Sequence, residues 1–288
     1  MNSYAKKREA KMILVAGRKG VGKTYQTLVM ISNYLQSSLK SKGRKVLIFD
    51  VNNEFGNVRK DHKNKIFPDI GLIKLNQVPA FAKLNQPIAK RVSIFKDNGK
   101  RMSLSEMGKA LGYILEHYRN GLLLIEDISK YITDSLPGDL IGSICTQRHV
   151  SVDVIIHVQT VGKLFNPKLW GNCNEVRLHR ADDTITRHKS KISGSIEHLL
   201  IMERLVEMKY KQGNRRFFCF LNKDTGKING RFTKEDFLKA VESYLSSNYI
   251  RILKPLLDKR NIYSGERVYK NQKQAVADYM NGLVLEYL

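Results

Sequence analysis

The chain has 288 residues, of which 42% are hydrophobic and 27% are charged. This is the balance of a folded globular protein, and it excludes a disordered or low-complexity chain. Lysine and arginine number 50 against 27 acidic residues, and the formal net charge of +23 favours a polyanionic partner, either nucleic acid or an anionic membrane. No apolar run reaches the roughly 20 residues that span a bilayer, and the N-terminus lacks the apolar core of a signal peptide. We therefore expect a cytoplasmic protein without an integral membrane segment.

Short apolar runs that alternate with helical patterns predict an α/β fold. The first run, Met12–Ala16, is typical of a strand that is buried on both faces of a parallel sheet. The stretch that follows carries apolar residues at spacings of three and four, on one face of a helix that we expect to end near Lys42 and Gly43. The residues of this face are Leu28, Ile31, Leu35 and Leu39.

Further along the chain, the apolar runs 46–49, 122–125 and 152–158 predict three more buried strands. Ser103 and Glu106 form a capping box that predicts a helix through about Tyr118, and Asn120 and Gly121 end this helix before the next strand. Prolines interrupt the pattern between Gly56 and Lys100, where only 91–95 is a convincing strand. We interpret about 57–100 as a basic insertion.

Beyond Gly194 the pattern changes. A helix is predicted over 196–208, a hairpin over the sequence FFCFLNKDTGKINGRF, and a further helix that begins after a Thr233 cap. The remaining C-terminal residues have helical spacing. The sequence thus predicts a core over 1–194 and a C-terminal hairpin and helical region over 195–288.

The sequence GRKGVGKT, at 17–24, has the spacing GxxxxGK[ST] between a predicted strand and a predicted helix. In this motif, backbone amides wrap a phosphate and the N-terminus of the helix adds partial positive charge. Lys23 would reach the β and γ phosphates of a nucleoside triphosphate, and the Thr24 hydroxyl would bind Mg²⁺. The predicted nucleotide-binding residues are Gly17, Arg18, Lys19, Gly20, Val21, Gly22, Lys23, Thr24 and Tyr25.

Acidic residues follow two of the predicted strands. LLLIED places Glu126 and Asp127 at the carboxyl edge of the sheet, where the phosphate loop also opens. One acid would hold Mg²⁺ and the other would polarise the attacking water, and we favour Glu126 for the metal and Asp127 for the water. The alternative is that these acids merely end a strand. Asp50 and Glu54, in FDVNNEFG, are candidate supporting acids at the same edge.

Two polar residues flank the fourth strand. Gln159 follows it, at a position where an amide would contact a γ-phosphate and report its loss. Arg148 precedes it, at the expected end of a helix. Arg148 is either a cation that satisfies helix-end carbonyls or a catalytic arginine that reaches into a neighbouring subunit.

Taken together, GRKGVGKT, FDVNNEFG, LLLIED and QRHVSVDVIIHVQT resemble the FtsK and HerA superfamily of P-loop motors. Within it, the chain is similar in character to viral genome-packaging ATPases and to the zonula occludens toxin-like phage assembly proteins. The resemblance implies a three-layer α/β/α P-loop NTPase fold with a mainly parallel sheet, and a small helical region beyond it here. It also implies a ring, commonly a hexamer, that binds ATP between subunits and pumps DNA.

Two features depart from this family pattern. The order Glu126-Asp127 inverts the usual Asp-Glu, which leaves the assignment of the base open. The toxin-like proteins usually carry a membrane anchor, whereas no such segment is predicted here, and this favours a motor closer to the packaging ATPases.

The resemblance does not extend past Gly194. The strip 179–191 is a candidate DNA or subunit contact, although a run of charge is more often a solvated surface; its basic residues are Arg180, Arg187, Lys189 and Lys191. The C-terminal region would bind DNA, dock on a capsid or membrane assembly partner, or pack within the ring.

The sequence therefore predicts an ATP-driven and Mg²⁺-dependent DNA translocase of the packaging type, which acts on double-stranded DNA in the cytoplasm, or in the host cytoplasm if the protein is viral. A single-stranded substrate stays open, because contacts to the nucleic-acid backbone do not reveal the strand type. The alternative is an ATP-gated loader or assembly adaptor in which the nucleotide switches a protein interface. A small-molecule kinase is disfavoured, because the basic excess would have no use.

Overall fold

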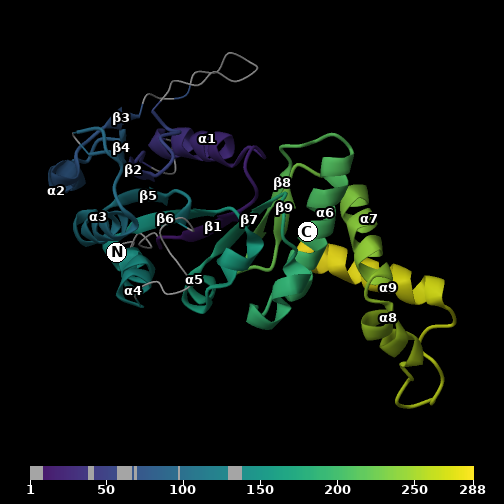
Figure 1. The fold of residues 1–288 in the computed structure, drawn as a ribbon. Helices are drawn as coiled ribbons and strands as arrows, with labels where there is room; N and C mark the ends of the chain where they lie inside the picture. The colour runs from purple at the N-terminus through teal and green to yellow at the C-terminus, as the bar shows by residue number, and fades with distance from the viewer. Residues whose placement is uncertain (1–8, 38–41, 57–66, 68–69, 97, 129–137) are drawn as a thin grey trace.

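A mostly parallel sheet organises the described part of the chain, which comprises residues 9–37, 42–56, 67, 70–96, 98–128 and 138–288 of the computed structural model (Figure 1). Among these residues, the sheet has nine strands in the order β3-β4-β2-β5-β6-β1-β7-β8-β9. All pairs from β3 to β7 are parallel, and β8 and β9 join antiparallel. The strands are β1 (Met12–Ala16), β2 (Lys45–Asp50), β3 (Gly71–Leu72), β4 (Ala89–Ser93), β5 (Gly121–Ile125), β6 (Val152–Val158), β7 (Glu175–His179), β8 (Phe218–Asn222) and β9 (Ile228–Gly230).

Helices cover both faces of this sheet, which gives the three-layer fold expected from the sequence (Figure 1). The α-helices are α1 (Lys23–Leu35), α2 (Val78–Lys83), α3 (Leu104–His117), α4 (Gly138–Thr146), α5 (Pro167–Asn172), α6 (Ile196–Lys211), α7 (Lys234–Ser246), α8 (Tyr249–Asp258) and α9 (Gln272–Tyr287). Short 3₁₀ helices are η1 (Leu75–Gln77), η3 (Gln147–Val150), η4 (Val161–Phe165) and η5 (Ile185–Lys191).

The two faces of the sheet have separate cores. On one face, Leu28 and Ile31 of α1 pack with Ile13 and Val15 of β1. On the other face, one continuous cluster joins residues of α3 and α4 to residues of α6 and α7. Successive residues of a strand point to opposite faces, so uninterrupted apolar strands are what this arrangement requires.

The helix boundaries follow local capping chemistry. The Ser103 side chain accepts a hydrogen bond from the Glu106 amide, and the Glu106 carboxylate accepts one from the Ser103 amide, which confirms the predicted capping box at α3. The prediction for α1 was wrong at its C-terminus, because the helix ends at Leu35 and Gln36 is extended. The Ser37 hydroxyl accepts a hydrogen bond from the Gly43 amide at 3.0 Å. Leu39 lies outside the described residues.

The segment that we interpreted as an insertion contributes to the sheet edge where it is described. β4 pairs with β2, and the two-residue β3 pairs with β4. Lys45, buried at the start of β2, donates hydrogen bonds of 2.8 Å to the carbonyls of Ala82 and Leu84 and so ties α2 to the sheet. Residues 57–66 lie outside the described part, and whether the segment is an insertion stays a prediction.

The C-terminal region continues the same sheet. The predicted hairpin is present as β8 and β9, and β8 pairs with β7 rather than standing apart. The last helix packs near α6, where the Tyr287 hydroxyl donates a 2.9 Å hydrogen bond to the Glu197 carboxylate. The proposed division at Gly194 stays a prediction. Among the described helices, none is long and apolar enough to cross a membrane.

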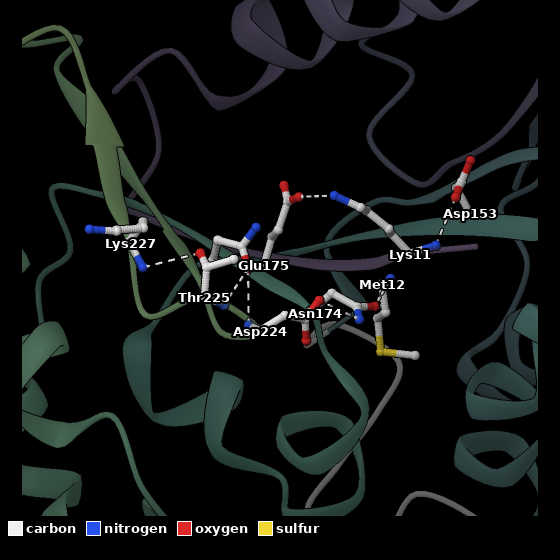
Figure 2. Close-up of polar contacts among 9 residues, drawn as sticks. Lys11, Met12, Asp153, Asn174, Glu175, Asp224, Thr225 and Lys227 are labelled. Carbon is white, nitrogen blue, oxygen red and sulfur yellow. Dashed lines mark hydrogen bonds and ion pairs between the residues drawn. The ribbon is translucent and has the colours of Figure 1, made fainter. Parts of the chain in front are cut away.

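Side-chain contacts hold the amino-terminal edge of the sheet together (Figure 2). The Asp153 carboxylate of β6 accepts a 2.7 Å hydrogen bond from the Lys11 amide, and the Lys11 ammonium pairs with Glu175 of β7 at 2.7 Å. Asn174 accepts from the Met12 amide at 3.0 Å. β1, which carries the phosphate loop at its other end, is thereby fixed to both neighbouring strands.

Candidate nucleotide site

The phosphate loop lies between β1 and α1, at the carboxyl edge of the sheet. Gly22, with φ +89°, adopts a left-handed conformation that disfavours any side chain, and α1 begins at the next residue. Gly17 is required for a different reason, because a Cβ at this position would lie 2.6 Å from the Cβ of His179. Among the other predicted loop residues, Lys19 is exposed, Val21 is buried and Tyr25 is partly buried. The first turn of α1, whose amides have no partner within the helix, thus follows the loop directly, as a phosphate site requires.

Lys23 is positioned inside this loop. Its ammonium donates hydrogen bonds to the Gly17 carbonyl and, at 2.8 Å, to the Arg18 carbonyl. Burial lowers the pKa of Lys23, while the charges of Asp127, Glu54 and Glu126 oppose this shift. The structure therefore brings Lys23 near all three acids, which follow the ends of two strands, β2 and β5.

Thr24 and the acids after β2 form a connected group. The Thr24 hydroxyl donates a 2.7 Å hydrogen bond to the Glu54 carboxylate. Asp50 is fully buried, and its carboxylate accepts from the Glu54 amide at 2.9 Å and from the Phe55 amide at 3.2 Å. The Arg91 guanidinium pairs with Asp50 at 3.2 Å. Asp50 thus shapes the turn that presents Glu54 to Thr24.

Glu126 is the most strongly perturbed acid of the site. Its side chain is buried, and it accepts a 3.1 Å hydrogen bond from the Asn52 amide. Burial, together with the negative charges of Asp50 and Glu54, raises the pKa of Glu126 to about 8. A nearby cation stabilises the ionised form of a carboxyl group in such surroundings, because the cation offsets the repulsion between the carboxylates.

Asp127 and Gln159 contact each other directly. The Gln159 amide donates a 2.7 Å hydrogen bond to the Asp127 carboxylate, across the ends of the neighbouring strands β5 and β6. Asp127 is buried, whereas Gln159 is exposed. Asp127 has φ +47°, a left-handed conformation that is uncommon outside glycine and is enriched at functional sites. The predicted water-polarising acid and the predicted sensor therefore form one pair.

The donor set fits Mg²⁺ in the form that phosphate-loop proteins use. Within the described residues, no cluster of three or more histidine, cysteine or acidic side chains could hold a metal ion. Mg²⁺ commonly keeps several waters and binds through one or two carboxylates together with substrate phosphates, so no such cluster is needed. The Thr24 hydroxyl and the neighbouring Glu54 and Glu126 carboxylates would supply the protein's share.

Of the remaining candidates, Arg180 adjoins the loop, where its carbonyl accepts a 2.8 Å hydrogen bond from the Arg18 amide, whereas Arg148 lies apart. Arg148 is exposed in η3 at the opposite end of β6. Because β6 has 7 residues and rises about 3.3 Å per residue, about 20 Å or more separate Arg148 from the strand end that carries Gln159. The Arg180 guanidinium forms a 2.9 Å ion pair with Glu207 of α6, so its partner here is a residue of the same chain and not DNA or another subunit. Three basic residues of the strip 179–191 are exposed in η5, namely Arg187, Lys189 and Lys191.

Two contacts from the C-terminal region reach the loop and were not foreseen from the sequence. The Arg18 guanidinium donates to the Tyr210 hydroxyl of α6 and lies 5.1 Å from the centre of the Tyr210 ring. The exposed Arg216, in the turn after α6, lies beside Gly22, where a Cβ would be 3.4 Å from its Cγ. No local sequence signal marks either contact, because both depend on how α6 folds back toward β1.

Comparison with known proteins agrees with this geometry. Residues 10–130 match the family model of the helicase HerA central domain. None of the curated proteins compared with the chain matches it.

Several solved structures resemble the chain. One is the genome packaging NTPase B204 from Sulfolobus turreted icosahedral virus 2 in complex with ATP-gammaS, at 14% identity and a TM-score of 0.46, covering 76% of this chain and 95% of that chain. Another is the N-terminal domain of zonular occludens toxin from Neisseria meningitidis, at 15% identity and a TM-score of 0.36, covering 67% of this chain and 99% of that chain. A third is the pCW3 conjugation coupling protein TcpA with ATPgS, at 10% identity and a TM-score of 0.41, covering 82% of this chain and 65% of that chain. At these identities the likeness concerns the fold alone.

The family match covers β1, the phosphate loop and α1, and it extends through β2 to the acids after β5. These are the elements that the sequence motifs singled out and that the structure joins at one sheet edge. Residues 10–130 are therefore similar to the central domain of the helicase HerA, and they carry the phosphate loop of a P-loop NTPase fold.

Proposed function

We propose that the protein is an ATP-driven DNA translocase of the genome-packaging type, which hydrolyses ATP at the subunit interfaces of a ring. The observation that carries the proposal is the convergence of the phosphate loop with acids and an amide from three other strand ends. Lys23 is near Glu54, Glu126 and Asp127, and Asp127 holds Gln159. This set supplies what phosphoryl transfer to water requires, namely charge neutralisation and a positioned base.

The chain's residues divide the work of hydrolysis as follows. Lys23 and the amides at the start of α1 bind and orient the phosphates. Mg²⁺, when bound, supplies positive charge beside the transferred phosphoryl group. Asp127 accepts the proton of the attacking water, and Gln159 orients the Asp127 carboxylate through its 2.7 Å hydrogen bond.

Arg148 supports hydrolysis between subunits rather than within one. At the opposite end of β6, its guanidinium is too far from its own phosphate loop to contact a phosphate there. Its exposure makes it available to the loop of an adjacent copy, where it would stabilise negative charge in the transition state. A closed ring, expected as a hexamer, satisfies this geometry for every copy.

The charge of the chain supports a DNA substrate. A net charge of +23 creates a field that attracts phosphates without reading base sequence, as a translocase needs. Arg187, Lys189 and Lys191 form an exposed basic strip on η5, adjacent in sequence to β7, and they are our candidates for a contact to DNA or to a neighbouring subunit.

Steady-state ATP hydrolysis tests the proposal, measured without DNA and with long double-stranded or single-stranded DNA. We expect duplex DNA to stimulate hydrolysis. We expect Lys23→Ala to abolish hydrolysis with and without DNA, because the ammonium that neutralises the phosphates is removed. Lys109→Ala, on the exposed side of α3, is the matched control and should hydrolyse ATP like the wild type.

Slow hydrolysis that no DNA accelerates would contradict the translocase. It would favour an ATP-gated adaptor, for which the contacts of Arg18 and Gly22 with the C-terminal region offer a route from the nucleotide to a protein interface. Measuring the oligomeric state with and without ATP then tests the ring separately from the hydrolysis.

A further inference from the structure

An arginine is buried directly beneath the phosphate loop. Arg177 of β7 has an exposed fraction of 0%. Its Nη2 donates to the Thr27 hydroxyl at 2.6 Å and to the Lys23 carbonyl at 3.3 Å, and its Nη1 lies 3.0 Å from the Met30 sulfur. These neighbours all belong to α1. The guanidinium therefore lies between the sheet and the first turns of the helix that begins at the phosphate loop.

Within the described part of the chain, no carboxylate pairs with this guanidinium, and its Nε has no hydrogen-bond partner. The pKa of Arg177 falls to about 9 through burial alone, with no opposing charge that would raise it. His157 and His179 lie nearby, and burial together with the charge of Arg177 holds the pKa of each imidazole well below its usual value. These histidines are therefore neutral and provide no counter-charge.

The surroundings of Arg177 increase this imbalance. The N-terminus of α1 carries partial positive charge, and Lys23 adds a full charge near the same point. Arg177 in turn lowers the pKa of Lys23. Burying an unpaired cation is strongly unfavourable, and it is more so beside two other positive groups. The charge of Lys23 is opposed by three nearby carboxylates, whereas the natural counter-charge for Arg177 is an anion in the phosphate loop.

We infer that Arg177 is a positioning residue for the nucleotide's phosphates, which supply the counter-charge that its buried guanidinium otherwise lacks. The inference rests on the proposed nucleotide-binding function and extends it to a residue of β7 outside the family match. Arg177 acts from beneath the loop in two ways. Its positive charge attracts the phosphates through the protein, and its hydrogen bond to the Lys23 carbonyl fixes the backbone from which Lys23 extends.

The test uses the full chain as wild type, Arg177→Met and Arg177→Lys, with calorimetric titration of ATPγS in the presence of Mg²⁺. Removing one unit charge about 10 Å from an anion should weaken binding on the order of tenfold at an effective dielectric constant of about 20. The nucleotide-dependent rise in Tm should accordingly shrink by about 2–3 °C at saturating nucleotide. Arg177→Lys keeps the charge and should bind within about threefold of the wild type.

Arg119→Met is the matched control. Arg119 is a partly buried arginine that donates to the carbonyls of Leu115 and Tyr118 at the end of α3, remote from the loop. The substitution Arg119→Met should lower the Tm of the protein without changing its affinity for nucleotide. A tenfold weaker Kd for Arg177→Met, with a near-normal Kd for Arg177→Lys, supports the inference.

An unchanged Kd for Arg177→Met would overturn the inference, since it would show that Arg177 only supports α1. If Arg177→Met does not fold, Arg177→Lys decides: a tenfold loss of affinity in this charge-conserving variant would equally overturn the role of the charge. If the wild type itself binds no ATPγS, the proposed function fails before the role of Arg177 is addressed, and Lys23→Ala would then match the wild type in the same titration.

Discussion

Replacing Glu126 with glutamine should stabilise the nucleotide-free protein at alkaline pH. The pKa of Glu126 is raised to about 8, from an ordinary value of 4.5, by burial and by the nearby charges of Asp50 and Glu54. Between these two pH values the folded state binds more protons than the unfolded state, so wild-type stability falls as the pH rises. A pKa raised from 4.5 to about 8 corresponds to about 5 kcal/mol at full ionisation, and local relaxation reduces this to about 2–5 kcal/mol.

Urea unfolding in the absence of Mg²⁺ and nucleotide, followed by fluorescence, measures this effect. Trp170 is the single tryptophan of the chain and is buried, so its emission reports the loss of the core. Glu126→Gln and wild type should be about equally stable near pH 4, and the variant should become the more stable of the two as the pH rises to about 9. The exposed Glu116→Gln should show no such divergence.

Mg²⁺ with ATPγS should narrow the difference, because a cation stabilises the ionised form of Glu126. The reasoning is refuted if the wild type and Glu126→Gln differ by a constant amount across this pH range. It is equally refuted if the glutamine variant is the less stable protein at about pH 9.

Further substitutions test the geometry around the loop and the packing of α3. Gly17→Ala would place a Cβ 2.6 Å from the His179 Cβ. We expect the free energy of unfolding in urea to fall by roughly 1–3 kcal/mol, and we expect nucleotide no longer to raise the Tm. Gly112→Ala, where a Cβ on α3 meets no atom within 4 Å, should instead stabilise by about 0.5–1 kcal/mol, and a destabilised variant would contradict the described packing. Asp50→Ala leaves the Arg91 guanidinium without its buried partner and should lower the free energy of unfolding by roughly 3–5 kcal/mol. In a double-mutant cycle, adding Arg91→Met to Asp50→Ala should recover part of this loss.

The sequence predicted the parts of the fold that local chemistry determines. β1 and β6 have the predicted bounds because strands buried on both faces are apolar without interruption. The caps at Ser103 and Thr233 were recognisable because each side chain bonds an amide three residues further on. The phosphate loop and the acids at the strand ends were likewise predictable, since parallel strands bring their carboxyl ends to one edge.

The rest depended on contacts between distant segments. β7 was not predicted, because its apolar residues alternate with Arg177 and His179, which are polar but buried here. The same polar residues make His179 look like the start of the charged strip 179–191. The contact of Arg216 with Gly22 also carries no local pattern, since it depends on the return of α6 and β8 to the sheet. Long-range placement of this kind cannot be deduced from periodicity alone.

The described sheet ends in unusually short strands at both edges. β3 has 2 residues and β9 has 3 residues, so each edge offers very few unpaired amides and carbonyls to another chain. Edges of this kind oppose the extension of the sheet from one molecule to the next, which is a common route to aggregation. Copies of this protein that meet in an assembly would therefore be joined by side chains and loops, and such contacts can loosen and re-form during a catalytic cycle without breaking a β-ladder.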